Sequence, residues 1–147
     1  MAIIQDSDSA MTSVLFVCQS NAVCSPIAEA LLKHLAADRF ETMSAGLQPT
    51  VIDTHTLAAL TQLGVNTEGL NSKGLDSIEE RYFDIVISLC EQAEEAARAI
   101  PANQFMAWHF EDTLCCSQPQ AAKVVHEIFE RIKLLVLLQD RKAKPLW

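Results

Sequence analysis

The chain has 147 residues, of which half are apolar, and carries a formal net charge of −8 at pH 7. This size suits one domain with a core of its own. Nucleic acids are bound largely through Lys and Arg, so the acidic balance disfavours a nucleic-acid partner. The longest apolar run, Leu134–Leu138, is far shorter than the roughly 18 residues that span a membrane. We therefore expect a soluble protein without a nucleic-acid or membrane partner.

The first twelve residues contain neither a basic start nor an apolar stretch of signal-peptide length. We interpret Met1–Thr12 as a disordered leader and residues 13–147 as a single domain, and we expect a cytoplasmic location. The five cysteines are then reduced thiols, because an odd number cannot form a closed disulfide framework.

Two short apolar runs, each ending on a cysteine, predict buried parallel strands. They are Ser13–Cys18 and Asp84–Cys90, and weaker strand patterns cover residues 40–44 and 104–110. The strand Asp84–Cys90 is followed by an Ala- and Glu-rich helix to about Ala99.

Capping and periodicity predict the other helices. Ser25 is placed as the cap and Pro26 at the first position of a helix whose apolar face includes Ile27, Ala30, Leu31 and Leu35. Asp53 caps a helix that stops at Gly64, a short helix is expected over residues 76–81, and a long one from Pro119 to about Gln139.

Strands that alternate with helices predict an α/β fold, a three-layer sandwich with a four-stranded parallel sheet and helices on both faces. Ligands of such sheets bind outside the carboxyl ends of the strands. Cys18, Cys90 and the loop over residues 111–117 all fall at that edge.

The loop between the first strand and the first helix carries the strongest chemical signal. It reads Cys18-Gln19-Ser20-Asn21-Ala22-Val23-Cys24-Ser25-Pro26. Backbone N–H groups of such a loop, together with a helix N-terminus, suit a tetrahedral oxyanion, and the same field lowers the pKa of a cysteine at the base of the loop. The loop predicts Cys18 as a nucleophile, against the alternative of a buried structural thiol.

In its motifs the chain resembles the low-molecular-weight protein tyrosine phosphatase family, especially the arsenate reductase branch. Cys18, Asn21, Ser25, Ala28 and Glu29 stand where the family motif has them, and the similarity extends to about Asp112. Further matches are Ser44-Ala45-Gly46, Leu63-Gly64, Ser88-Leu89-Cys90 and Trp108-His109-Phe110-Glu111-Asp112.

The resemblance implies roles for these residues. Cys18 is the nucleophile, Asp112 the general acid, and Cys90 the second thiol, which attacks Cys18 and leaves a disulfide. Residues 19–25 form the oxyanion-binding loop, with Asn21 and Ser25 holding the loop and the thiolate.

The resemblance also implies a partner and a relay. The substrate is a small oxyanion such as arsenate or phosphate, or a phosphoprotein. No bound cofactor is expected, and the reductant is an external thiol, thioredoxin or glutathione with glutaredoxin. The third reductase cysteine would fall near Ala97 and is absent, so Cys24, Cys115 and Cys116 are the candidates for a disulfide relay. Asn21, Glu29 and Ser44 match part of a cation site of some reductases, and the ammonium group of Lys73 could replace that ion.

One position departs from the family in a way that matters for chemistry. The family has arginine six residues after the cysteine, and here that residue is Cys24. Arginine supplies a fixed charge and a planar donor pair, and transition-state arginines are worth on the order of 10³ to 10⁵ in phosphoryl-transfer rate. Ser20 likewise replaces the family's glycine.

Several functions therefore remain open. The first is an arsenate-reductase-like thiol redox enzyme that uses Cys18 and Cys90. The second is a catalytically impaired pseudophosphatase that binds an anion or a protein, and a third is a tyrosine phosphatase of weak activity. A soft thiolate site for arsenite or a metal ion, made by Cys18, Cys24 and Cys90, is the least favoured because the spacing matches no common zinc motif.

Overall fold

The computed structural model describes residues 11–21, 23–70, 72–78, 81–110 and 118–143, and in the last helix the side chains of residues 119–139. The elements in chain order are β1 (Thr12–Cys18), α2 (Cys24–Ala36), β2 (Phe40–Gly46), α3 (Thr54–Gln62), the 3₁₀ turn η2 (Leu75–Ile78), β3 (Phe83–Ser88), the 3₁₀ turn η3 (Glu91–Ala93), α4 (Glu94–Arg98), β4 (Ala102–Ala107) and α5 (Gln118–Ala143).

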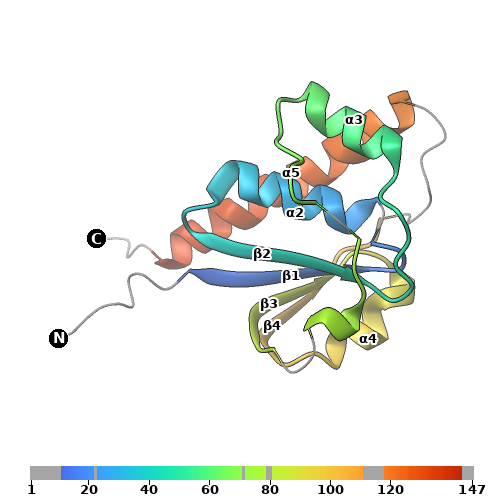
Figure 1. Cartoon of the computed structure of the whole chain (residues 1–147). Helices are drawn as coiled ribbons and strands as arrows, with labels where there is room; N and C mark the ends of the chain where they lie inside the picture. The colour runs from blue at the N-terminus through green and yellow to red at the C-terminus, as the bar shows by residue number, and fades with distance from the viewer. Residues whose placement is uncertain (1–10, 22, 71, 79–80, 111–117, 144–147) are drawn as a thin grey trace.

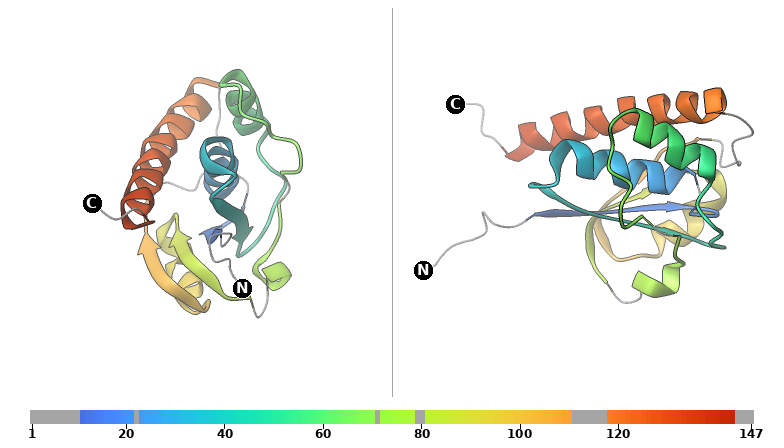
Figure 2. Two further views of the ribbon diagram at one scale, coloured as in Figure 1. Left: turned by 90° about the vertical axis from the view of Figure 1, so that its left-hand side faces the viewer. Right: turned by 45° about the horizontal axis from the view of Figure 1, so that its top comes forward.

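The four strands form one parallel sheet in the order β2-β1-β3-β4. Helices α2, α3 and α5 lie over one face of the sheet, and α4 with η2 lies on the other (Figure 1 and Figure 2). The predicted α/β architecture is thus confirmed.

Strand β1 lies inside the sheet, between β2 and β3, and explains the continuous apolar run in the sequence. Val14, Leu15, Phe16 and Val17 are all fully buried, because helices cover both faces of the sheet. Trp108, which follows β4, packs its ring 6.2 Å from that of Phe16 and is 8% exposed, so it belongs to the core.

Three predicted features of the first helix and the leader are wrong in detail. Helix α2 begins at Cys24 after Val23 and has no side-chain cap, so Ser25 lies within the first turn and does not cap it. Leu35 is 37% exposed and lies off the buried face. Thr12 belongs to β1, where it pairs with Phe40, and so is not part of a leader.

The other boundaries shift by a few residues. The strand expected to end at Cys90 ends at Ser88, and the helix after it is split into η3 and α4. The last strand ends at Ala107 rather than Phe110, residues 75–78 form a 3₁₀ turn where a helix over 76–81 was expected, and α5 runs from Gln118 to Ala143. Asp53 does cap α3, since its carboxylate accepts from the backbone N–H of Thr56 at 3.0 Å.

Within the described part of the chain, none of the helices has the length and apolar character that crossing a bilayer requires.

Candidate active site

The sulfur of Cys18 lies in a buried polar site at the end of β1. The backbone N–H of Asn21 donates to Cys18 Sγ at 3.2 Å, and Ser25 Oγ lies 2.9 Å from the same sulfur. All three residues are fully buried. Hydrogen bonds of this kind stabilise a thiolate, which is the nucleophilic form of cysteine.

Asn21 organises the turn that surrounds the thiol. Its φ of +52° lies in the left-handed region, which asparagine tolerates better than most residues. Its side-chain nitrogen lies 2.7 Å from Ser25 Oγ and 3.1 Å from Ser44 Oγ, and its Oδ1 accepts from the backbone N–H of Lys73 at 2.6 Å. One side chain therefore connects the loop to β2 and to the segment that precedes η2.

A buried carboxylate continues this network beneath the loop. Glu29 of α2 accepts from Ser44 Oγ at 2.5 Å, and its carboxylate lies 3.0 Å from Lys33 Nζ and 3.8 Å from Lys73 Nζ. The ammonium group of Lys73 thus lies beside the Asn21–Glu29–Ser44 set that the sequence matched to part of a cation site. Burying a carboxylate is costly unless it is paired, and the two lysines supply the pairing.

Backbone hydrogen bonds connect the loop to the chain that follows β2. The carbonyl oxygens of Cys18, Gln19 and Ser20 accept, respectively, from the N–H groups of Leu47 at 3.2 Å, Gln48 at 2.8 Å and Thr50 at 3.0 Å. This is an arrangement that the sequence did not indicate. It fixes these three loop carbonyls toward the segment that follows β2, while the N–H of Asn21 donates to Cys18 Sγ.

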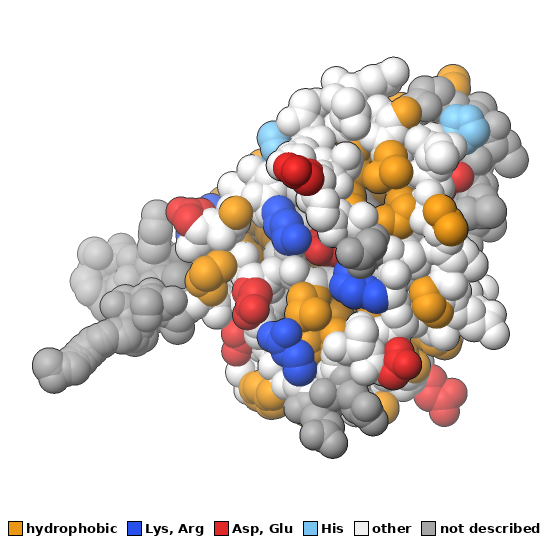
Figure 3. All heavy atoms as spheres, in the orientation of Figure 1, with side chains coloured by type: hydrophobic (Ala, Val, Ile, Leu, Met, Phe, Trp, Pro, Cys, Tyr) orange, Lys and Arg blue, Asp and Glu red, His pale blue; other side chains and the backbone are white. Residues whose placement is uncertain are grey.

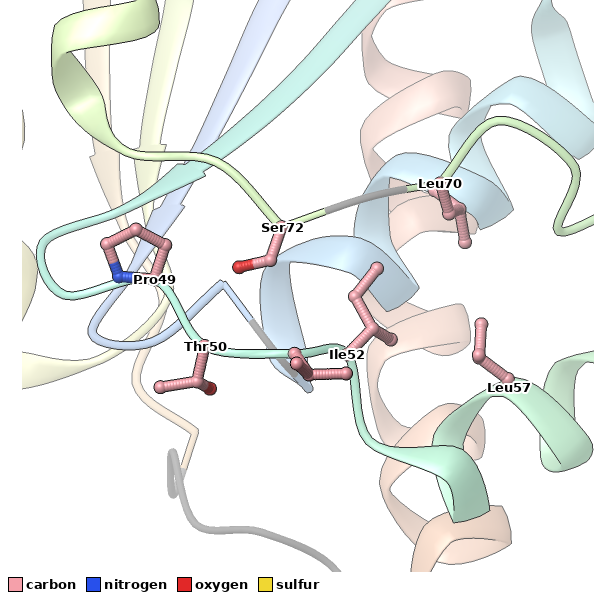
Figure 4. A pocket seen from close by; sticks show the side chains of 7 residues that line it. Pro49, Thr50, Ile52, Leu57, Leu70 and Ser72 are labelled. Carbon is pink, nitrogen blue, oxygen red and sulfur yellow. The ribbon is translucent and has the colours of Figure 1, made fainter.

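A shallow groove of about 630 Å³ lies beside the loop, on the side of Ser20 (Figure 4). Its walls are uncharged, with the side chains of Ile52, Leu57 and Leu70 pointing toward a common space. Thr50 and Ser72 line it as well and connect it to the loop, because the Thr50 N–H and Ser72 Oγ both donate to the carbonyl of Ser20.

Cys90 comes to the same edge of the sheet as Cys18. Val17 of β1 is paired with Ser88 of β3, and the N–H of Leu89 donates to the carbonyl of Val17 at 2.9 Å. Cys90 follows directly, is 1% exposed, and immediately precedes η3. Cys18, Cys24 and Cys90 are in the thiol form, without a disulfide, in this structure.

Cys24, which the resemblance in sequence places at the family's arginine position, is the first residue of α2 and is fully buried. In the described part of the chain, no group of three or more His, Cys, Asp or Glu side chains is placed to hold a metal ion. Cys18, Cys24 and Cys90 therefore do not form such a group either. Of the predicted site residues, Asp112, Cys115, Cys116 and Ala22 lie outside the described residues.

His109, next to the predicted acid loop, takes part in an exposed cluster of charged side chains. Its Nε2 lies 3.3 Å from a carboxylate oxygen of Glu94, which also pairs with Arg98 at 3.1 Å. The hydrogen bond from Arg98, and then that from His109, lowers the pKa of Glu94 below its usual value.

On the face drawn in Figure 3, basic and acidic side chains are interspersed.

Comparison with known proteins places the chain in a family. Residues 13–144 match the family model described as low molecular weight phosphotyrosine protein phosphatase. The chain belongs to this family.

Arsenate reductases stand out among its relatives. A glutaredoxin arsenate reductase of Synechocystis sp. is 27% identical over 127 residues, which cover 86% of this chain and 97% of that protein. A solved arsenate reductase in its phosphate-binding state superimposes with a TM-score of 0.76 at 26% identity, covering 86% of this chain and 98% of that one. A thioredoxin-dependent arsenate reductase of Corynebacterium glutamicum gives a TM-score of 0.68 at 31% identity, and the match covers 86% of this chain and 61% of that one.

Proposed function

We propose that this member of the family is an arsenate-reductase-type thiol redox enzyme, with Cys18 as nucleophile and Cys90 as resolving thiol. The observation that carries the proposal is the buried site around Cys18 Sγ, with the Asn21 N–H at 3.2 Å and Ser25 Oγ at 2.9 Å, next to the strand that leads to Cys90.

The proposed reaction has two covalent steps. The Cys18 thiolate attacks the arsenic of arsenate, and one oxygen leaves as water after protonation, for which Asp112 is the proposed acid. The Cys90 thiolate then attacks Cys18 Sγ, and the electron pair of the sulfur–arsenic bond stays on arsenic. Arsenic is reduced by two electrons to arsenite, and the two thiols are oxidised to a disulfide.

An external thiol must reduce this disulfide for turnover to continue. Thioredoxin, or glutathione with glutaredoxin, is the proposed reductant. Two relatives support this proposal, since one is a glutaredoxin arsenate reductase and the other a thioredoxin-dependent arsenate reductase. Because the chain has no cysteine near Ala97, where the resemblance would place a third reductase cysteine, Cys24, Cys115 and Cys116 are the proposed relay thiols.

Anion capture rests on backbone groups in this proposal. Cys24 offers no positive charge, so the loop N–H groups and the first turn of α2 supply the field that attracts the oxyanion. We expect weak substrate binding and little hydrolysis of phosphate esters. The same substitution favours a second candidate function, in which the domain binds an anion or a protein partner without turnover.

A coupled assay separates the two candidates. The wild-type chain is incubated with arsenate and either the thioredoxin or the glutathione and glutaredoxin system, and arsenite is measured. We expect arsenite with one system, and its loss in Cys18→Ser and in Cys90→Ser. A folded wild-type protein that binds arsenate or phosphate but forms no arsenite with either system would instead establish the binding function.

A further inference from the structure

Cys90 lies in a segment whose backbone leaves the regular ladder of the sheet. The N–H of Leu89 donates toward β1, to the carbonyl of Val17 at 2.9 Å, whereas the carbonyl of Leu89 accepts from the N–H of Phe110, beyond β4, at 2.8 Å. In a regular parallel strand the two backbone groups of one residue point to the same neighbouring strand. The chain therefore rotates at Leu89, and the direction of Cys90 is set by local hydrogen bonds.

Two donors hold the carbonyl of Cys90. Ser88 Oγ donates to it at 2.9 Å, and the backbone N–H of Ala93, in η3, donates to it at 3.2 Å. All three residues are buried. Ser88 itself is fixed in the sheet, because it pairs with Val17 of β1 and with Ala107 of β4. The Ser88 hydroxyl thus ties the peptide group of Cys90 to the end of β3.

The hydroxyl of Ser88 is not required to close this turn. The N–H of Ala93 already satisfies the Cys90 carbonyl, and alanine at position 88 would differ from serine by one buried oxygen atom. A buried hydroxyl costs free energy unless it is hydrogen-bonded, so a serine here gains little stability over alanine. What the second donor adds is a fixed orientation of the Cys90 peptide group.

We propose that Ser88 is a positioning residue, which orients Cys90 for its attack on Cys18. This inference rests on the proposed function for the role of Cys90 as resolving thiol, but not on arsenate as the substrate. Attack on a sulfur atom requires a thiolate that is close to it and in line with the bond that breaks. Without the Ser88 hydroxyl the Cys90 peptide group samples more orientations, so the productive one is reached less often.

Hydrogen peroxide tests this role without arsenate. Peroxide oxidises the Cys18 thiolate to a sulfenic acid, and hydroxide leaves. The Cys90 thiol then attacks the sulfenic sulfur, so that the S–S bond forms, the S–O bond breaks and the oxygen leaves as water. The fully reduced chain is treated with peroxide, dimedone traps the remaining sulfenic acid at each time point, and peptides are mapped by mass spectrometry.

The wild type should form mainly the Cys18–Cys90 disulfide. Ser88→Ala should form it about tenfold more slowly and accumulate the dimedone adduct of Cys18, while the alkylation rate of Cys18 stays unchanged. Ser88→Thr, which keeps the hydroxyl, should restore the disulfide. The matched control is Ser13→Ala, because the Ser13 hydroxyl accepts from the N–H of Asp84 at 2.9 Å at the opposite end of the sheet. A merely structural role would lower stability toward urea without changing the ratio of disulfide to adduct.

A Ser88→Ala variant that forms the disulfide as fast as the wild type, or faster, would overturn the proposal. So would equal slowing in Ser13→Ala, no recovery in a folded Ser88→Thr protein, or a wild type that forms no Cys18–Cys90 disulfide with peroxide. If Ser88→Thr does not fold, the comparison of Ser88→Ala with Ser13→Ala still decides.

Failure of this proposal and failure of the proposed function give different results. A disulfide that depends on Ser88, with no arsenite formed from arsenate, would reject arsenate reduction and leave the role of Ser88 standing. Arsenite formation that requires Cys90, with equal peroxide results for the wild type and Ser88→Ala, would reject only the role of Ser88.

Discussion

Gly46, at the end of β2, lies directly against Asn21 of the loop that follows β1. A methyl group on Gly46 would meet the backbone nitrogen of Asn21 at 2.7 Å and its Cβ at 2.8 Å, distances that real contacts do not reach. That nitrogen is the one that donates to Cys18 Sγ. The absence of a side chain at Gly46 is therefore a condition for the geometry of the thiol site.

Gly46→Ala should consequently disturb the loop. We expect a loss of stability of about 1–3 kcal/mol, with slower reaction of Cys18, because the backbone of Asn21 must move. Urea unfolding and thiol alkylation measure the two effects. Gly74→Ala is the matched control, since a methyl group there meets only the flexible carboxylate of Asp76 within 3 Å. Equal behaviour of the two variants would contradict the close packing at Gly46.

Ser25→Ala should slow the alkylation of Cys18 near neutral pH. The hydroxyl lies 2.9 Å from the sulfur and accepts from the side-chain amide of Asn21 at 2.7 Å, so its loss removes one of the groups that stabilise the thiolate. The pH dependence of alkylation by iodoacetamide would shift upward. Ser77→Ala serves as control, because Ser77 is exposed and bonds only the carbonyl of Gly74 among the contacts described. An unchanged pH profile in Ser25→Ala would remove Ser25 from the activation of the thiol.

The two lysines that pair with Glu29 should differ in importance. The side chain of Lys73 is 25% exposed, whereas that of Lys33 is 51% exposed and lies one helical turn from Glu29, so solvent screens the Lys33 pair more. We expect Lys73→Met to cost about 1–3 kcal/mol of folding free energy and Lys33→Met less than about 0.5 kcal/mol. Chemical denaturation of both variants checks this order, and the reverse order would contradict the assigned role of Lys73.

Cys24→Arg should produce measurable hydrolysis of an aryl phosphate. Arginine at this position would supply the charge and the two-pronged donor that phosphate transfer requires. The assay is the release of p-nitrophenol from its phosphate ester, with Cys24→Lys as a control for charge without the planar donor pair. No gain in a folded Cys24→Arg protein would mean that the loop differs from a phosphatase site in more than this residue.

The strands and the sheet edge were predictable because of burial on both faces. That burial makes β1 and β3 continuous apolar runs, and the topology of parallel sheets then brings Cys18 and the end of β3 to one edge. The helix starts were less predictable. Ser25 has the chemistry of a cap, but its hydroxyl bonds Asn21 and lies beside Cys18, and nothing in the local sequence separates the two uses.

The contacts that shape the loop were beyond local patterns altogether. Asn21 and Lys73 are 52 positions apart, and the partners in their bond are a side-chain oxygen and a backbone N–H. Thr50 likewise binds Ser20 through backbone groups that every residue except proline possesses. Such contacts leave no periodicity or composition signal, so only the three-dimensional arrangement reveals them.

Disulfide mapping after a single turnover tests the central claim most directly. The fully reduced chain is mixed with arsenate without any external reductant, the remaining thiols are blocked, and peptides are analysed by mass spectrometry. The proposed function predicts a Cys18–Cys90 disulfide together with an equal amount of arsenite. A disulfide through Cys24 would change the resolving thiol, whereas arsenite release without oxidised Cys18, or no oxidation at all, would contradict the account.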